Sequence, residues 1–195
     1  TSGMNPKLNQ SGCTLIVLAE WKPPVYSNSG IRVITSSIRR NSPQFLDSKI
    51  HHNNLLNNIL AVIEANVSDV DSAIMLDNNG FVSETNDTNI FIVSNNEIHT
   101  PTADSCLPGI TRKMIIDIAN KEGIKIQERN ISNSELYTAD EVFTSGTMGE
   151  ITPILEADGR KIGDGTQGSM TKKIQSLHSD YAFKNGEPVP FSQPK

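Results

Sequence analysis

The sequence from residue 107 to residue 121 reads LPGITRKMIIDIANK. Pro108 and Gly109 set a turn, and the apolar residues that follow Thr111 recur at helical spacing. The helix that this predicts begins with backbone N–H groups that have no partner within it, at the positive end of its dipole. Such a place can hold a phosphate. A turn of this kind often only begins a helix, so the pattern alone leaves both possibilities open.

The composition is that of a globular domain without a role in nucleic-acid binding or in a membrane. The chain has 195 residues, of which 36% are hydrophobic and 20% charged, and its formal net charge is −5. It lacks the basic excess that general nucleic-acid binding requires, and its longest apolar run, residues 15–19, is too short to cross a membrane. Cys13 and Cys106 lie far apart and match no metal-ligand spacing. This usage suits a reducing intracellular compartment, cytoplasmic or organellar.

Short apolar and β-branched runs predict strands along most of the chain. The predicted strands are 13–20, 31–38, 73–77, 80–84, 89–93, 97–100, 124–129, 141–145, 150–157 and 160–162. Helical spacing of apolar residues predicts helices at 54–66, 111–122, 132–138 and 168–183. Residues 41–53 are expected to form a loop with a short extended piece near 49–51. The mixture predicts an α/β domain (mixed α+β) rather than a sandwich.

Two polar stretches beside predicted strands are candidates for chemistry. Glu84 ends a strand in the stretch FVSETN (81–86), where an acid is usually a solvated turn residue. Residues 145–150 form a small, hydroxyl-rich turn that could supply donors to an anion or could be a plain glycine turn. His51 and His52 are adjacent, but no third ligand accompanies them, so no metal site is predicted.

Taken together, six stretches make the chain resemble the class IV aminotransferases, the pyridoxal 5′-phosphate (PLP) enzymes of fold type IV. The stretches are NLLNNILA (54–61), IMLDNNGFVSETN (74–86), NIF (89–91), LPGITR (107–112), ADEVFTSGT (139–147) and DGRKIGDG (158–165). The resemblance implies the large C-terminal domain of the D-amino acid aminotransferase-like PLP-dependent fold over residues 13–185. Residues 1–12 would be the remnant of an interdomain linker and 186–195 a C-terminal arm. The family's small N-terminal domain, which supplies a phosphate-binding arginine, would be missing, and the chain is expected to begin inside a longer protein.

The resemblance also implies roles for residues around the cofactor. Glu84 would pair with the pyridine nitrogen, because a buried carboxylate keeps that nitrogen protonated and lets the ring draw electrons. Leu107 would pack against the ring. Ile110, Thr111 and Thr147 would provide donors to the phosphate, and Gly146 would also contact the cofactor. Met148 and Gly149 would meet the substrate carboxylate.

The chain departs from the family pattern at position 51. The family has a lysine there that forms a Schiff base with the cofactor, and alignment on the motif that begins at Asn54 puts His51 in its place. An imidazole has no primary amine and cannot form that bond, although it can act as a general base. Lys49 is the alternative amine, which on an extended strand would face the same side, roughly 6–7 Å away, and which a bulge could shift. A smaller departure is Ser169, where the family usually has proline.

Three functions are compatible with these residues. The first is the family's reaction, in which PLP carries an amino group between an amino acid and a 2-oxo acid, with branched-chain or D-amino acids as the family's substrates. The second is a catalytically inactive homologue that keeps the PLP pocket as a binding or interaction domain. The third is a PLP-dependent aminodeoxychorismate lyase. The family also implies a homodimer.

Overall fold

The computed structural model describes residues 5–8, 12, 14–27 and 29–187. Among them, nine strands form one sheet. The strands are β1 Ile31–Thr35, β2 Ser72–Leu76, β3 Val82–Thr85, β4 Asn89–Ser94, β5 Glu97–Thr100, β6 Ile126–Glu128, β7 Glu141–Gly146, β8 Glu150–Ala157 and β9 Arg160–Lys161. The helices are α1 Leu56–Val67, α2 Ile110–Lys121, α3 Asn133–Tyr137 and α4 Ser169–Asn185, with a 3-10 turn at Pro6–Leu8. The predicted mixed α/β class is confirmed.

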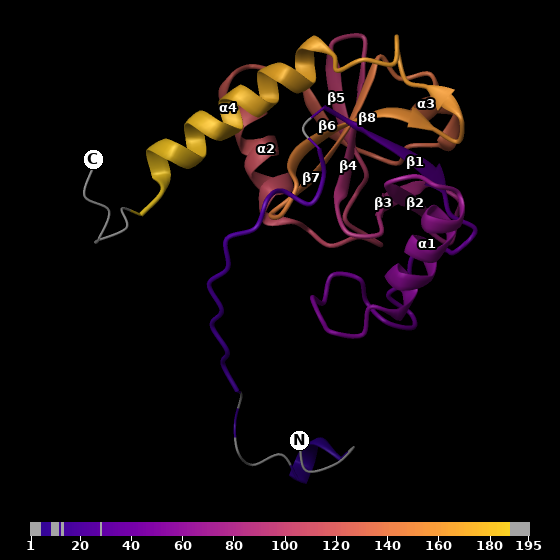
Figure 1. Cartoon of the computed structure of the whole chain (residues 1–195), viewed down its shortest axis with the longest axis vertical. Coiled ribbons are helices and arrows are strands. Elements are labelled where there is room, and N and C mark those ends of the chain that lie inside the picture. Colours follow the sequence, from indigo (N-terminus) through magenta and orange to yellow (C-terminus); the bar gives the residue numbers. More distant parts are fainter. Residues whose placement is uncertain (1–4, 9–11, 13, 28, 188–195) are drawn as a thin grey trace.

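Six of the strands close into a barrel (Figure 1). In the order β3, β2, β1, β8, β7 and β4 each strand is hydrogen-bonded to the next, and β4 pairs back onto β3. β1 runs parallel to β2 and to β8, and the other neighbours in the ring are antiparallel. The closing contact between β3 and β4 is the residue pair Glu84 and Asn89. The seam of the barrel therefore lies at these two polar residues.

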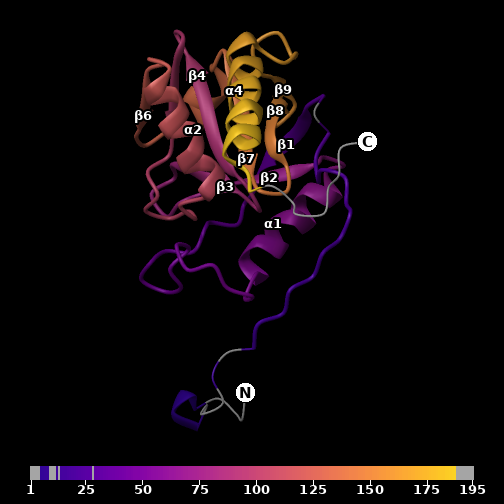
Figure 2. The same ribbon diagram turned by 90° about the vertical axis from the view of Figure 1, so that its left-hand side faces the viewer.

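The barrel strands place alternate side chains on opposite faces. One set fills the barrel with Ile31, Val33, Ile74, Leu76, Val82, Ile90, Ile92, Val142 and Ile154. The opposite face of β4 and β7 carries Phe91 and Phe143, whose rings stack with centroids 4.9 Å apart. These rings share a second core with Ile115 of α2 and Ile174 of α4. Figure 2 shows these two helices together against the sheet.

Helix α1 packs on β2 with its small side chains and leaves its large ones in solvent. Ala61 and Ala65 are buried in a cluster with Ala73 and Met75. The large apolar side chains of the helix and of the residue before it are 41–61% exposed: Leu55, Leu56, Ile59, Leu60 and Ile63. The predicted helix is confirmed, with its larger apolar face turned outward.

The strand predicted at 13–20 is wrong over its described residues. Residues 14–20 form no regular structure, and Leu15 and Val17 are 87% and 82% exposed. A strand is stable when a neighbour takes up its N–H and C=O groups, and none of the described strands lies beside this segment. β1 pairs with β2 and β8 instead. Cys13 lies outside the described residues.

Glycines occupy the turns of two hairpins. Gly80 and Gly159 adopt φ angles of +85° and +72° in the turns of two antiparallel hairpins, where a side chain would be strained. The predicted C-terminal arm begins at Gly186, directly after α4, but residues 188–195 lie outside the described part of the chain. No helix among the described residues is long and apolar enough to span a membrane.

Candidate functional site

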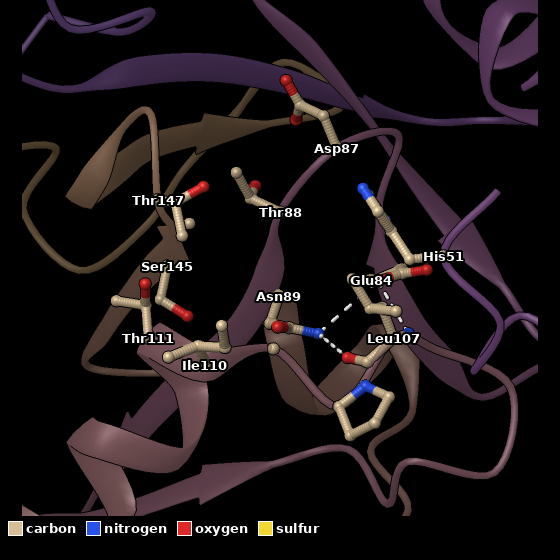
Figure 3. A pocket seen from close by; sticks show the side chains of 13 residues that line it. His51, Glu84, Asp87, Thr88, Asn89, Leu107, Ile110, Thr111, Ser145 and Thr147 are labelled. Atoms are coloured by element: carbon tan, nitrogen blue, oxygen red, sulfur yellow. Dashed lines mark hydrogen bonds between the residues drawn. The ribbon is translucent and has the colours of Figure 1, made fainter. Parts of the chain in front are cut away.

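A cavity of about 460 Å³ opens at one end of the barrel. It is lined by His51, Glu84, Asp87, Thr88, Asn89, Leu107, Pro108, Gly109, Ile110, Thr111, Ser145, Gly146 and Thr147. Thr111, Ser145 and Thr147 lie together on one side of it (Figure 3). Glu84 and His51 lie together on the other side. The fold thus brings the start of α2, the end of β7 and the seam of the barrel to one place.

Glu84 is a buried acid with three donors around it. It is 5% exposed, and its Oε1 accepts a hydrogen bond from Arg40 Nε at 2.5 Å. Its Oε2 accepts from the Leu107 N–H at 3.3 Å and from Asn89 Nδ2 at 3.5 Å. Burial raises the pKa of Glu84 to about 7, although Arg40 acts to lower it. The cavity therefore contains a carboxyl group that changes charge near neutral pH.

The start of α2 presents backbone N–H groups to the opposite side of the cavity. The first hydrogen bond of the helix runs from the Lys113 N–H to the Gly109 carbonyl at 2.9 Å. The N–H groups of Ile110 and Thr111 precede it and have no partner within the helix. Gly109 brings no capping side chain, and a Cβ at Gly109 would collide with Asn89 Oδ1. These donors lie at the positive end of the helix dipole, where an anion is stabilised.

A buried hydroxyl lies on the same side. Ser145 is 1% exposed, and its Oγ has no hydrogen-bond partner among the described residues. A buried hydroxyl without a partner costs free energy, so its place in the cavity wall indicates a ligand that would bond to it. The next residue, Gly146, passes so close to Thr88 that an added Cβ would lie 2.9 Å from Thr88 Cγ2. None of the described residues that line the cavity is Lys or Arg, so neutral donors form this anion seat.

Asp87 connects the cavity to the chain before β1. The Tyr26 hydroxyl donates to the Asp87 carboxylate, 2.7 Å from each oxygen, and the Val25 N–H donates to the Met148 carbonyl at 3.1 Å. Burial, with Asp87 adding to it, raises the pKa of Tyr26 well above its ordinary value, so the phenol keeps its proton and remains the donor. These contacts fasten residues 25–26 and the turn after β7 to the seam of the barrel.

His51 and Lys49 have different positions. His51 lines the cavity on the side of Glu84, whereas Lys49 is exposed and lines neither this cavity nor the one that adjoins it. The extended piece predicted near 49–51 is wrong: Asp47 makes a turn, accepting at its carbonyl from the Ile50 N–H at 3.0 Å and at Oδ1 from the Lys49 N–H at 3.0 Å. Because the chain turns here, Lys49 does not face the side that an extended strand would give it.

The two residues predicted to meet a substrate carboxylate, Met148 and Gly149, do not line the same cavity. Met148 lines a second cavity of about 310 Å³, which shares His51 and Glu84 with the first. Gly149 lines neither cavity and lies beneath Tyr26, where an added Cβ would be 3.2 Å from Tyr26 Cδ2. The predicted cofactor residues, in contrast, all line the first cavity.

Arg40, Asp87 and Ser145 are residues of the site that sequence reasoning did not single out. Ser145 belongs to the hydroxyl-rich turn at 145–150, and its neighbours carried the signal. Arg40 had no such signal, because its partner Glu84 is 44 residues away. Asp87 follows directly on the 74–86 motif, but its partner Tyr26 lies 61 residues earlier.

Comparison with known proteins places the chain in a family. Residues 2–157 match the family described as amino-transferase class IV. Branched-chain-amino-acid aminotransferase-like protein 2 of Arabidopsis thaliana is 58% identical over 194 residues, which are 99% of this chain and 35% of that protein. The chain thus spans about a third of the length of this relative.

Two solved structures match the fold at similar levels. The branched-chain aminotransferase of Thermoproteus uzoniensis, solved with norvaline, gives a TM-score of 0.79 at 37% identity, and the match covers 84% of this chain and 55% of that one. The branched-chain amino acid aminotransferase of Thermobaculum terrenum, solved in its PLP-form, gives a TM-score of 0.78 at 29% identity, over 82% and 53%. The family match runs through the last residue of β8, so it takes in every strand of the barrel and every residue that lines the cavity. The chain belongs to the class IV aminotransferases.

Proposed function

We propose that the cavity is a seat for PLP and that this chain is the cofactor-holding part of an aminotransferase that moves an amino group between an amino acid and a 2-oxo acid. One observation carries the proposal: an anion seat with an unpartnered Ser145 hydroxyl lies across one cavity from the buried Glu84 carboxyl. PLP has a phosphate at one end and a ring nitrogen at the other. The relative from Thermobaculum terrenum, solved in its PLP-form, supports this assignment.

The residues present fit this cofactor. The Ile110 and Thr111 N–H groups and the Thr147 hydroxyl would hold the phosphate, and Ser145 Oγ would gain the partner that it lacks among the described residues. Gly146 would let the phosphate approach the backbone. Glu84 would accept a hydrogen bond from the protonated ring nitrogen.

The chain's own work is to hold the ring and to place protons. When bound, PLP supplies an electron sink that eases removal of a proton from the α-carbon of an amino acid. Glu84 would keep a proton at the ring nitrogen, and Leu107 would cover one side of the cavity. The His51 imidazole nitrogen can take a proton from the substrate α-carbon and return it. Met148 lies in the adjoining cavity, where the substrate would enter.

A specific observation also favours the second candidate, an inactive homologue. His51 cannot attach to PLP covalently, and the nearest lysine in sequence, Lys49, is exposed and lines neither cavity. Both candidates share the binding step and differ in turnover.

The test is a titration of the chain with PLP, monitored by absorbance and fluorescence. A parallel titration with pyridoxal, which lacks the phosphate, measures what the phosphate contributes. We expect saturable PLP binding, weaker pyridoxal binding, and release of the cofactor on dialysis. In the His51→Lys variant, borohydride should trap the cofactor on the peptide that carries position 51. Absence of saturable PLP binding in both proteins would overturn the proposal.

Product analysis separates the candidate functions once binding is established. Amino transfer to a 2-oxo acid would identify the aminotransferase, and pyruvate release without an acceptor would identify the lyase. Retained PLP binding with neither product would identify the inactive homologue.

We also propose that the chain forms a homodimer through the outer face of α1. The large apolar side chains there are exposed (Leu55, Leu56, Ile59, Leu60 and Ile63), and no charged residue occurs between His52 and Glu64. A face without charges suits a twofold contact, because the same patch meets itself without like-charge repulsion.

Sedimentation over a range of concentrations tests the dimer. Ile59→Asp should shift the chain to monomer, whereas Phe183→Asp, at a 90% exposed position on α4, should not. A wild-type chain that is monomeric at every concentration would contradict the dimer.

A further inference from the structure

Arg40 is a buried cation that contacts Glu84 of the candidate site. It is 8% exposed and donates through Nε to Glu84 Oε1 at 2.5 Å. It lines the adjoining cavity of about 310 Å³ but not the cavity that faces the α2 start. The other oxygen, Glu84 Oε2, accepts from Leu107 and Asn89. Arg40 therefore acts on one oxygen of the carboxylate, while protein groups on the cavity side hold the other.

Two asparagines of α1 orient the Arg40 guanidinium. Arg40 Nη1 donates to Asn57 Oδ1 at 3.0 Å and to Asn58 Oδ1 at 3.3 Å. Each amide is also fixed at its other end: Asn57 Nδ2 donates to the Arg39 carbonyl at 2.8 Å, and Asn58 Nδ2 donates to the Asn86 carbonyl at 2.6 Å. With both ends bonded, the amides cannot flip without losing hydrogen bonds. This gives Asn57 and Asn58 of the 54–61 motif a physical task.

We propose that Arg40, oriented by Asn57 and Asn58, is a positioning residue that keeps Glu84 ionised and aimed at the ring-nitrogen end of the cavity. Arg40 acts on the ring-nitrogen end of the cavity through Glu84. The identity of that ligand rests on the proposed function. The charge relation between Arg40 and Glu84 does not, because it can be measured in the ligand-free chain.

The other groups that face Glu84 do not replace Arg40. Asp87 is a second acid and adds to the rise in the pKa of Glu84. Burial raises the pKa of the Cys106 thiol to about 12, so Cys106 remains neutral. His51 lines the same cavity but is exposed. Among the described residues, Arg40 is the positively charged side chain that contacts Glu84. Without it, the Glu84 carboxyl group would keep its proton to higher pH.

The first test is the thermal unfolding of the ligand-free chain at pH 5 and pH 8. Glu84 is mostly protonated at pH 5 and mostly ionised at pH 8, since its pKa lies at about 7. Arg40→Met should therefore lower Tm more at pH 8 than at pH 5. In the Glu84→Gln background this difference between the two pH values should disappear. Arg39→Met is the matched control, because Arg39 is exposed and its guanidinium donates to the carbonyls of Ser36 and Ser37 rather than to an acid.

An equal loss at both pH values, or a pH dependence that survives in Glu84→Gln, would overturn the proposal and leave Arg40 a purely structural residue. Asn57→Ala keeps the cation and serves if Arg40→Met does not fold. It should shift the Tm difference in the same direction by a smaller amount, and no pH dependence in Asn57→Ala would count against the orienting role.

The second test links Arg40 to the ligand. Arg40→Met should weaken PLP binding at pH 8 by about tenfold, since a hydrogen bond to an ionised group is lost at the ring nitrogen. Binding of inorganic phosphate, which needs only the α2 side, should not change. If wild type does not bind PLP while the pH result stands, the proposed function fails alone. If PLP binds both proteins equally, the positioning role fails alone.

Discussion

Ser145 and Glu84 are two buried polar residues in opposite situations. Ser145 Oγ has no partner among the described residues, whereas the Glu84 carboxylate accepts from Arg40, Leu107 and Asn89. The hydroxyl is a cost that a ligand can remove. The carboxylate is a desolvated charge that Arg40 offsets only in part. Each residue therefore predicts a distinct response to substitution.

Replacing Ser145 by alanine should stabilise the ligand-free chain by about 1 kcal/mol, because an unsatisfied buried hydroxyl is removed. The same change should weaken PLP binding by about tenfold, because a donor to the phosphate is lost. Ser83→Ala is the control of opposite sign: Ser83 is buried and its Oγ donates to the Ser105 carbonyl at 3.1 Å. Urea unfolding and PLP titration measure both effects, and a destabilised Ser145→Ala would contradict the first.

Glu84 should make the stability of the ligand-free chain depend on pH. Its pKa is raised from 4.5 to about 7 in the folded chain, so its contribution is fully present below the unfolded pKa and is lost as pH rises through 7. The loss is at most about 3 kcal/mol. Comparing the unfolding free energy of wild type and Glu84→Gln between pH 5 and pH 8 isolates it. Parallel curves for the two proteins would contradict the prediction.

At the scale of elements, a side chain of β7 fixes the start of α4. Glu141 of β7 accepts from the N–H groups of Met170 and Thr171 at 2.8 and 2.7 Å, which satisfies donors that a helix start leaves open. Ser169 is the first residue of the helix, and Gly168 before it has φ −77° and ψ 170°. That backbone is compatible with a following proline, the residue that the family usually carries there.

Ser169→Pro should therefore stabilise the chain by roughly 0.4–1 kcal/mol, because proline at the first helical position restricts the unfolded chain and removes no helical hydrogen bond. Ser176→Pro, inside the same helix, should cost about 3 kcal/mol or more. Differential scanning calorimetry of the two variants tests the position dependence. A destabilised Ser169→Pro would show that the start of α4 differs from the one described.

The elements that sequence predicted well are those that local residues determine. α2 follows from the Gly109 turn and helical spacing, and the β8–β9 hairpin follows from Asp158 and Gly159. The closure of the barrel and the pair Arg40–Glu84 join residues far apart in sequence, which no local pattern records. The failure at 14–20 has a related cause, since a short apolar run indicates a strand but does not supply its neighbour.

At the scale of the whole molecule, the barrel is tied to the chain that precedes it at Tyr26. Within the described part of the chain, residues 14–24 make no hydrogen bond to the barrel, and the first contacts come from Val25 and Tyr26. Residues 14–24 therefore extend away from the barrel, and the chain joins it at Val25 and Tyr26 (Figure 1).

Deleting residues 1–24 should leave the free energy of unfolding almost unchanged. Deleting residues 1–29 should lower it by roughly 2–4 kcal/mol. The longer deletion removes the buried Tyr26 ring and its hydrogen bonds to Asp87. Thermal unfolding of the two truncated chains measures the difference. Tyr26→Phe in the full chain separates the hydroxyl from the ring, and equal losses in both truncations would contradict the boundary.

The pairing of β1 with β8 governs when the cavity can form. Ile31 lies beside Ile154, so the ring joins strands that are far apart in the sequence, and such contacts form slowly. During synthesis from the N-terminus, β1 can pair with β2 early, but it must wait for β8 to leave the ribosome. A nascent chain therefore exposes one edge of β1 until residues 150–157 have been made. The ligand can find its seat only after β8 has left the ribosome.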